Sequence, residues 1–362
     1  MLFNRKQILE ILINHQNNVD KRAINPIFSS VRFYSNGKDF FISSMDGERQ
    51  LHHATESTYP EFDIFLPCAN LYELLKKSNS ETFELVESDS NYTIKIGNGE
   101  FIFAKYAQKG YPEWQDSYEH EVILNAEVLA NALKLVKWAS SNDDSRPFLN
   151  GVCLDFQEEI NICSTDGLRL ALQKLPNTTG ITGTWIFSRK SVNDLVKLLE
   201  DASGDVRLYL GKNAQIKFST NAKQHSEITW NTLLVAGKFP QYSKIIPTTS
   251  ISKLQIEGKE FVETIERMMI MANINQPVVT LNLGSNSTIF SENALSSGKD
   301  NLGGVYKGEE LKISFNGRLL LEILNNVSGA LNFEINNPYA PVLITSEKYK
   351  DAVFILAPVK KD

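Results

Sequence analysis

A threefold internal repeat constrains this chain more than any other feature. Three segments share one pattern, in which a turn-forming stretch leads into a helix with apolar residues at matched places. They span residues 66–75, 187–196 and 315–324. The apolar spacing predicts an amphipathic helix in each segment. Because the repeat is domain-sized, we expect three copies of one domain rather than a solenoid.

The remaining elements repeat in the same way. A further helix is expected to begin each copy, and the three candidates are residues 6–13, 126–138 and 259–271. Asn4 and Asn125 are suitable N-caps for the first two. Alternating apolar residues predict strands, among them residues 92–96, 206–210, 278–283 and 352–356. We therefore divide the chain into units 1–120, 121–250 and 251–362, each an α+β domain with two helices packed on antiparallel sheet.

An Asp-Gly-x-Arg motif occurs in two of the copies. It comprises Asp46 to Arg49 and Asp166 to Arg169, and residues 291–294 replace it in the third copy. Glycine readily takes a positive φ, so Asp-Gly favours a tight structural turn. One alternative is a hydrolase with Asp46 and Asp166 as acids, but the third copy lacks the motif. Arg169, a long cation beside apolar residues, is also suited to line a binding site.

Motifs for catalysis, cofactors and metals are absent from the sequence. There is no phosphate-binding loop, dinucleotide fingerprint, HExxH helix or nucleophile elbow. Cys68, Cys153 and Cys163 fit no metal spacing. His52 and His53 are adjacent, so their side chains should point apart, and we expect a solvated pair. The sequence predicts no enzyme, no cofactor and no metal.

The charge balance restricts the kind of partner. Asp and Glu number 43 against 37 Lys and Arg, which gives a net charge of −6. A protein that coats DNA would be basic overall, but an acidic chain can confine positive charge to one face. Basic residues do recur on the expected helices: Arg5, Lys6, Lys76, Lys77, Lys134, Lys137, Lys190, Lys197, Arg267 and Arg318. The three cysteines cannot all form disulfides with one another, which favours a reduced, cytoplasmic location. The lack of long apolar stretches predicts that the protein does not contact a membrane.

Five motifs in order carry a family resemblance. They are residues 145–152, 164–171, 237–247, 313–316 and 357–360. They resemble motifs of the bacterial DNA polymerase III beta subunits, the sliding clamps, and the similarity covers the whole chain in the expected order. The resemblance implies three clamp-type domains per protomer and a ring-forming head-to-tail homodimer that encircles double-stranded DNA without catalysis. It also implies partners: the replicative polymerase alpha subunit, the clamp loader, and other polymerases or repair proteins.

The resemblance further implies a groove between the second and third domains that binds short partner peptides. Its implied members are Leu149, Thr165, Gly167, Leu168, Arg169, Leu170, Pro240, Lys244, Ile245, Asn316, Leu319, Ile355, Leu356, Ala357, Pro358, Val359 and Lys360. Leu168, Lys244 and Leu319 depart from the common family choices, and lysine lacks the bidentate contacts of arginine. An ordinary edge strand is the alternative for the apolar C-terminal segment, which Lys361 and Asp362 extend.

Two more sets of residues follow from the resemblance. The implied DNA-facing residues are Arg22, Arg146, Lys190, Lys197, Lys134 and Lys137. The implied dimer contacts are Phe101 and Phe103 from one protomer with Ile270 and Met271 from the other. The alternatives are solvated helix faces for the cations and ordinary core positions for the phenylalanines. A repeat-built adaptor unrelated to DNA is the competing function.

Overall fold

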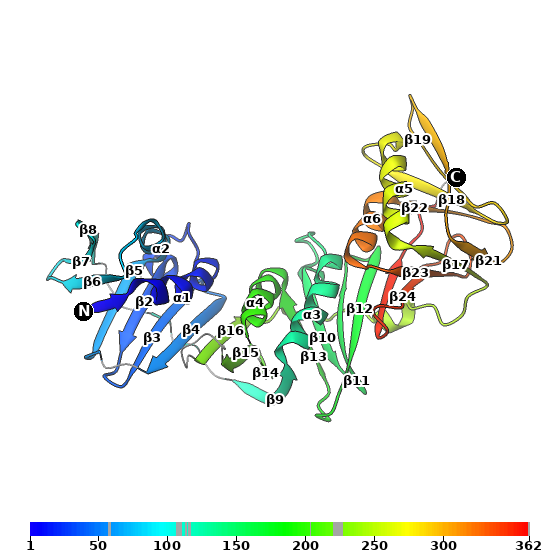
Figure 1. The fold of residues 1–362 in the computed structure, drawn as a ribbon. Coiled ribbons are helices and arrows are strands. Elements are labelled where there is room, and N and C mark those ends of the chain that lie inside the picture. Colours follow the sequence, from blue (N-terminus) through cyan, green and yellow to red (C-terminus); the bar gives the residue numbers. More distant parts are fainter. Residues whose placement is uncertain are drawn as a thin grey trace. The chain divides into compact units, whose positions relative to one another are not determined.

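The computed structural model describes residues 1–56, 59–105, 111–112, 114, 117–202, 204–219 and 227–360. It divides into two compact units. Unit 1 contains residues 1–130 and 190–234, and unit 2 contains residues 131–189 and 235–362 (Figure 1). In the described part of the chain, no helix is long and apolar enough to cross a membrane.

The helices occupy the segments that the repeat predicts. They are α1 (Arg5–Asn18), α2 (Cys68–Lys77), α3 (Ala126–Val136), α4 (Arg189–Asp201), α5 (Gly258–Met271) and α6 (Gly317–Asn326). Both expected caps are confirmed, since Asn4 Oδ1 accepts from Gln7 N at 3.0 Å and Asn125 Oδ1 accepts from Val128 N at 3.2 Å. The α3 helix is shorter than expected, and a 3-10 turn (Lys137–Ala139) continues it.

Unit 1 contains two antiparallel sheets. The larger has the order β5-β2-β3-β4-β16-β15-β14-β9, and the smaller β1-β6-β7-β8. The larger consists of β5 (Phe62–Pro67), β2 (Ser30–Ser35), β3 (Asp39–Met45), β4 (Arg49–Glu56), β16 (Glu227–Leu233), β15 (Asn213–Ser219), β14 (Asp205–Gly211) and β9 (Tyr118–Asn125). The smaller consists of β1 (Leu2–Asn4), β6 (Thr82–Glu87), β7 (Asn91–Ile96) and β8 (Gly99–Ala104).

Unit 2 repeats this layout. Its larger sheet has the order β13-β10-β11-β12-β25-β24-β23-β17-β21, and its smaller sheet β20-β19-β18-β22. The larger consists of β13 (Gly183–Ser188), β10 (Gly151–Phe156), β11 (Glu159–Thr165), β12 (Arg169–Pro176), β25 (Ala352–Leu356), β24 (Val342–Ser346), β23 (Ala330–Ile335), β17 (Ser252–Glu257) and β21 (Val305–Lys307). The smaller consists of β20 (Ser297–Asn301), β19 (Thr288–Glu292), β18 (Val278–Leu283) and β22 (Leu311–Asn316).

The strand orders confirm the internal repeat. The series β5-β2-β3-β4, β13-β10-β11-β12 and β22-β18-β19-β20 follow one topology, and the series β1-β6-β7-β8, β9-β14-β15-β16 and β17-β23-β24-β25 follow another. Pairing of β4 with β16 and of β12 with β25 joins strands from successive repeats into one sheet. The central repeat therefore contributes strands to both large sheets.

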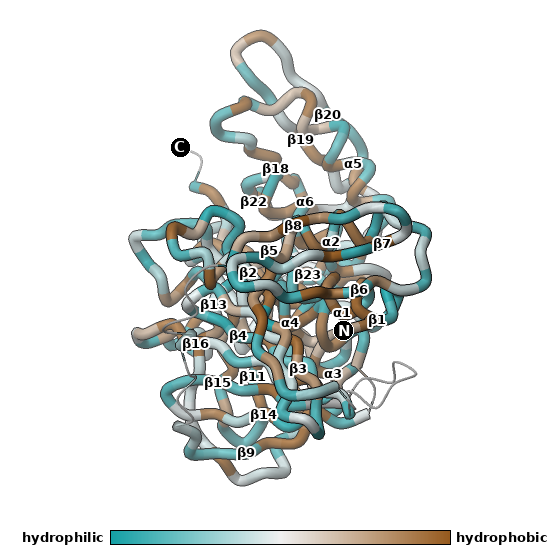
Figure 2. The backbone as a smooth tube through the Cα atoms, turned by 90° about the vertical axis from the view of Figure 1, so that its left-hand side faces the viewer, coloured by the Kyte–Doolittle hydropathy of each residue, from teal (hydrophilic) through white to brown (hydrophobic). Residues whose placement is uncertain are grey.

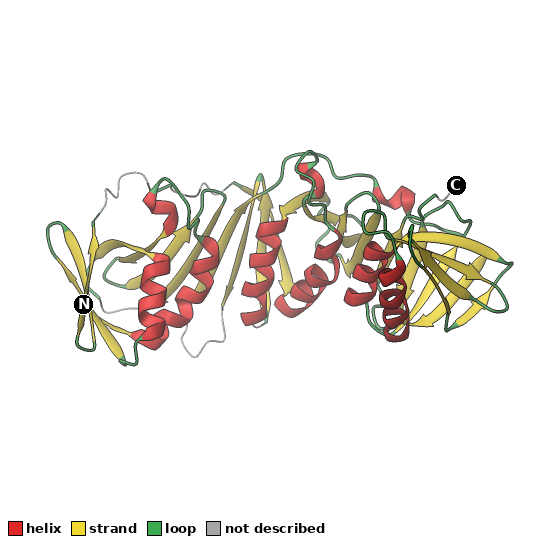
Figure 3. Cartoon of the chain, turned by 90° about the horizontal axis from the view of Figure 1, so that it is seen from above, coloured by secondary structure: helices red, strands yellow, loops and turns green. Residues whose placement is uncertain are grey.

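The cores lie where helices cover the sheets. The α1 helix packs beside α2 and against β3 and β4, and α5 packs beside α6 and against β17 to β20 (Figure 3). Along β14, Val206, Leu208 and Leu210 are buried while their neighbours are exposed or half-buried. Hydrophobic and hydrophilic residues alternate along the strands in this way (Figure 2). This two-residue period places one face of each strand in the core.

Buried histidines connect α1 to the sheet of unit 1. His15 Nδ1 lies 2.7 Å from Ser44 Oγ, and His15 Nε2 lies 3.0 Å from His53 Nδ1. The adjacent His52 turns the other way, with its Nδ1 2.7 Å from Ser43 Oγ. The two side chains point apart as expected, but a solvated pair is wrong, because His53 is only 4% exposed. His15 lies on α1, 38 positions before His53, so the sequence around residues 52–53 does not indicate this contact.

We expect these three histidines to make the folded protein less stable in acid. Burial lowers the pKa of His53 to about 3 and that of His52 to about 4, and holds the pKa of His15 well below its usual value of 6.5. The unfolded chain takes up these protons near pH 6.5, whereas the folded chain does not. The free energy of unfolding should therefore fall as the pH drops from about 6.5 towards 4, by up to about 1.4 kcal/mol per pH unit for each histidine.

The variant His53→Gln should lose one histidine's share of this slope. Denaturant unfolding at several pH values between about 6.5 and 4 measures it. An identical slope in the parent and the variant would contradict the assignment.

Candidate functional site

The second Asp-Gly motif forms a tight turn between β11 and β12. Asp166 Oδ1 accepts from Leu168 N at 2.8 Å and from Arg169 N at 3.0 Å. Gly167 has a φ of 92°, and Gly47 in the matching turn has a φ of 94°. Glycine takes this conformation without steric cost, so the expected structural role of the motif is confirmed.

Arg169 is held inside unit 2 by this turn and two other segments. Its side chain is 7% exposed. Nε donates to Asp166 Oδ2 at 3.1 Å, Nη1 to Glu322 Oε2 at 2.6 Å and Nη2 to the Trp138 carbonyl at 3.1 Å. The guanidinium also lies 5.2 Å from the centre of the Trp138 ring. Through these bonds the Arg169 guanidinium joins β12 to α6. The contribution of Arg169 to a neighbouring groove is therefore to hold the 166–169 turn in position.

The corresponding acid of unit 1 is similarly engaged. Asp46 bonds to Arg49, and its side chain, 3% exposed, also pairs with Lys190 Nζ at 2.6 Å. Burial alone would raise its pKa, but the hydrogen bonds from Arg49 and Lys190 outweigh burial and lower it. A carboxylate held ionised by two cations is unsuited to donate a proton. The described residues also contain no group of three or more potential metal ligands. The pairing of Asp46 argues against its role as the acid of the hydrolase alternative.

The C-terminal segment brings three parts of the expected groove together. The β25 strand pairs with β12, so that Ile355 lies opposite Leu170 and Leu356 opposite Arg169. Beyond the strand, Ala357 N donates to the Leu168 carbonyl and Val359 N to the Ser314 carbonyl, each at 2.8 Å. The segment is thus tied to the 166–169 turn on one side and to β22 on the other. Lys361 and Asp362 lie outside the described residues.

Exposure separates the expected groove residues into buried, exposed and half-buried sets. Five are below 4% exposed: Leu149, Thr165, Leu170, Ile355 and Leu356. Leu168 is 57% and Ile245 44% exposed, and Pro240, Lys244 and Lys360 are exposed as well. Leu319, Ala357, Pro358 and Val359 are half-buried. The Asn316 side chain caps α6 by accepting from Arg318 N at 3.0 Å. The accessible apolar surface therefore belongs to Leu168, Pro240 and Ile245, supported by the buried set.

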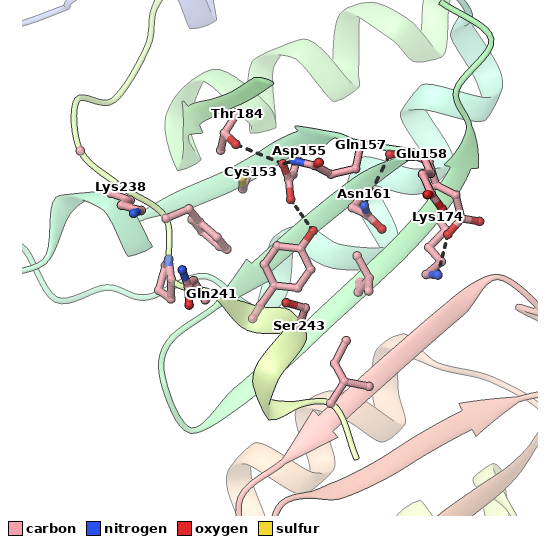
Figure 4. Close-up of a pocket in the computed structure, with 17 residues that line it drawn as sticks. Cys153, Asp155, Gln157, Glu158, Asn161, Lys174, Thr184, Lys238, Gln241 and Ser243 are labelled. Carbon is pink, nitrogen blue, oxygen red and sulfur yellow. Dashed lines mark hydrogen bonds and ion pairs between the residues drawn. The ribbon is translucent and has the colours of Figure 1, made fainter. Parts of the chain in front are cut away.

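An open hollow of about 740 Å³ lies in unit 2 beside β10, β11 and the 237–246 segment (Figure 4). Of the expected groove residues, only Pro240 lines it. Tyr242 donates to Asp155 Oδ2 at 2.6 Å, and Thr184 Oγ1 donates to Asp155 Oδ1 at 3.1 Å. Burial and then the bond to Asp155 raise the pKa of Tyr242. Phe239 and Tyr242 line this hollow and belong to the 237–247 motif, but neither was among the expected groove residues.

The expected DNA-facing cations fall in both units. Arg22 and Lys197 are exposed in unit 1, where Lys190 is paired with Asp46. In unit 2, Lys134 and Lys137 are half-buried, and Arg146 lies 3.3 Å from Asp143. Other helix cations serve internal contacts. Arg5 donates to the carbonyls of Leu75 and Ser80, Arg267 to Asp300, and Arg318 to the carbonyl of Ile274. A basic face shared by all the helices remains a prediction.

The expected dimer residues lie at open edges. Phe101 is 40% exposed and Phe103 half-buried on β8, an end strand of its sheet. Ile270 is 72% exposed and Met271 half-buried near the end of α5, which packs against β20. Phe101 is therefore not an ordinary core residue in a single chain.

Comparison with known proteins agrees with the repeat. Models of the DNA polymerase III beta subunit match in order along the chain, the N-terminal domain at residues 1–115, the central domain at 123–241 and the C-terminal domain at 243–360. The beta sliding clamp of Rickettsia felis is 26% identical over 94% of both chains. That of Haemophilus influenzae is 25% identical over 99% of this chain and 98% of its own.

Solved structures show the same fold. The DNA polymerase III subunit beta of Pseudomonas aeruginosa covers all of both chains with a TM-score of 0.92 at 21% identity. A sliding clamp from Bartonella birtlesii, bound to griselimycin, has a TM-score of 0.91 at 25% identity and covers 100% of this chain and 99% of its own. The fold is therefore that of three tandem clamp domains. This chain belongs to the family of DNA polymerase III beta subunits.

The buried arginine predicts a measurable stability effect. Arg169→Met leaves Asp166 and Glu322 without their cation, so the free energy of unfolding should fall by about 2–4 kcal/mol. Lys174→Met is the matched control, because Lys174 and Glu159 pair on the surface with side chains 42% and 47% exposed. Its cost should be at most about 1 kcal/mol. Denaturant unfolding measures both variants, and equal losses would contradict a structural role for Arg169.

Proposed function

We propose that this chain is a DNA sliding clamp, a ring-shaped and non-catalytic processivity factor. It encircles duplex DNA and tethers the replicative polymerase. The observation that carries the proposal is the match of all three beta-subunit domain models, in order, on a chain that is itself a threefold repeat. Such a factor works on chromosomal DNA, which places it in the cytoplasm of a bacterium.

Ring formation requires two copies and three domains in each. We retain units 1–120, 121–250 and 251–362 as those domains, which the model matches support with similar limits. Within one chain, β8 and β20 end their sheets. Two identical heterologous contacts, each between β8 of one protomer and β20 of the other, close the two protomers into a ring. Phe101 and Phe103 on β8 would then meet Ile270 and Met271 beside β20.

The charge distribution suits a protein that holds DNA by topology. A net charge of −6 makes strong general affinity for phosphate unfavourable. Arg22, Lys134, Lys137, Arg146, Lys190 and Lys197 would supply weak, sequence-independent phosphate contacts inside the ring. Weak contacts permit sliding, whereas tight ones would arrest it.

The proposal predicts that release from DNA depends on topology rather than on salt. Protein loaded onto nicked circular DNA should stay bound in about 0.5–1 M salt, a range that dissociates ordinary electrostatic complexes. It should leave when one cut linearises the circle. Gel filtration of the DNA-bound fraction before and after cutting measures this. Loss from the intact circle at high salt would show ordinary electrostatic binding, and no association under any condition would favour the adaptor alternative.

We further propose that Leu168, Pro240 and Ile245, with the C-terminal segment, form a groove for short peptides of polymerases, the clamp loader and repair proteins. Their exposure, 57% for Leu168 and 44% for Ile245, leaves apolar surface available. The buried neighbours and the bonds of Ala357 and Val359 hold this surface in place. The griselimycin-bound relative from Bartonella birtlesii shows that a family member accepts a ligand.

Apolar anchoring predicts the effect of polar substitutions in the groove. Leu168→Ser together with Ile245→Ser should weaken binding of a polymerase C-terminal peptide by at least about 100-fold, since each anchor contributes roughly 1.5–3 kcal/mol. Ile251→Ser is the control, because Ile251 is 70% exposed but outside the proposed groove. Calorimetric titration measures the three affinities. Unchanged binding by the double variant would remove the groove assignment.

A further inference from the structure

The proposed groove draws its residues from three separate segments of unit 2. One is the 165–170 segment, whose turn carries Leu168, and another is the 355–360 segment at the end of the chain. The third is α6, which contributes Leu319 and its N-cap Asn316. Because these segments are far apart in the sequence, contacts between them set the width of the groove. Such a groove binds best when its segments are already in place before the peptide arrives.

The turn that carries Leu168 is internally rigid. Asp166 Oδ1 accepts from the backbone N–H groups of Leu168 and Arg169. Thr165 Oγ1 accepts from Gly167 N at 3.0 Å and donates to the Arg169 carbonyl at 2.5 Å. The turn is therefore positioned as one body, and its bonds to other segments decide where Leu168 lies.

Hydrogen bonds join the three groove segments pairwise. The C-terminal segment donates from its backbone to the Leu168 carbonyl of the turn and to the Ser314 carbonyl of β22, which leads directly into α6. The remaining link joins α6 to the turn, because Glu322 Oε2 accepts from Arg169 Nη1 at 2.6 Å. Of these three links, the one between Arg169 and Glu322 is the link between charged side chains.

Arg169 connects Glu322 to the atoms that hold the turn. Its Nε donates to Asp166 Oδ2 at 3.1 Å, while the other oxygen of that carboxylate accepts from the turn backbone. The Arg169 side chain is 7% exposed, whereas that of Glu322 is 45% exposed. A substitution of Glu322 therefore changes the link between α6 and the turn without opening a cavity in the core.

Unit 1 contains the same kind of link. Asp194 on α4 occupies the position that Glu322 has in the repeated helix, and it pairs with Arg49. Arg49 in turn pairs with Asp46 of its own turn. A carboxylate at this helix position therefore binds the arginine of the Asp-Gly-x-Arg turn in both units.

The link in unit 1 has a second cation that the link in unit 2 lacks. Lys190 on α4 pairs with Asp46 at 2.6 Å. Its position in α6 is taken by Arg318, whose Nη2 donates to the Ile274 carbonyl at 2.6 Å instead. Among the described residues, two cations therefore join the turn of unit 1 to α4, whereas Arg169 alone joins the turn of unit 2 to α6.

We propose that Glu322 is a positioning residue for peptide binding, which through Arg169 fixes the 166–169 turn relative to α6. This inference rests on the proposed groove and identifies a residue outside it that sets its affinity. Without the carboxylate, the turn and α6 hold their spacing in only a fraction of the molecules. The apparent Kd for a peptide then rises by the inverse of that fraction.

The test compares the rates of peptide binding. Glu322→Gln removes the charge and keeps the size, so the polymerase C-terminal peptide should associate about three- to tenfold more slowly and dissociate at the parent rate. Glu322→Asp keeps a carboxylate, as Asp194 does in the preceding repeat, and should restore most of the association rate. Glu334→Gln is the matched control, because Glu334 pairs with Lys253 at 3.5 Å outside the groove segments. Stopped-flow fluorescence of a labelled peptide measures both rates.

Denaturant unfolding of the same variants separates positioning from folding. Glu322→Gln and Glu334→Gln should have the same unfolding midpoint, although only Glu322→Gln slows association. A parent-like association rate would overturn the inference, and so would a loss confined to the dissociation rate, which would indicate direct contact with the peptide. A loss of affinity matched by a lower midpoint than that of Glu334→Gln would overturn it in favour of a purely structural role. A parent protein that fails to bind the peptide would overturn the groove proposal itself.

Discussion

Strand pairing across the boundaries between repeats is the interaction on which the other features depend. A sheet edge presents unpaired N–H and C=O groups and must be paired or protected. Within the chain, β4 and β12 meet this requirement through β16 and β25. These pairings bring Arg49 within reach of Asp194 and Arg169 within reach of Glu322. They also place the C-terminal segment beside the 166–169 turn, which assembles the proposed groove.

Local elements of the fold were predictable from the sequence. The helices, the Asn4 and Asn125 caps and the positive φ of Gly47 and Gly167 depend on residues within a few positions of one another. Their repetition along the chain strengthened each assignment. The sequence also suggested that a binding surface, rather than an active site, surrounds residues 165–170.

Contacts between distant residues were not predictable. Arg169 and Glu322 are 153 positions apart, so the sequence alone suggested that the Arg169 side chain was available to bind a ligand. His15 and His53 are 38 positions apart, and the sequence around the His52-His53 pair suggested solvent exposure instead. Tyr242 and Asp155 meet only through the packing of the 237–246 segment on β10. In each case the pairing partner, rather than the residue type, determines the role.

The turn at Asn293 in the third repeat forms the same backbone hydrogen bonds as the two Asp-Gly turns, since Asn293 Oδ1 accepts from Leu295 N at 2.8 Å and from Ser296 N at 2.9 Å. In Asp46 and Asp166, Oδ1 holds the turn while Oδ2 bonds to the arginine. Asparagine keeps the first oxygen and replaces the second with an uncharged amide. One nucleotide transition converts an aspartate codon into an asparagine codon. A single-base change therefore removes the charge from this turn and leaves its backbone hydrogen bonds intact.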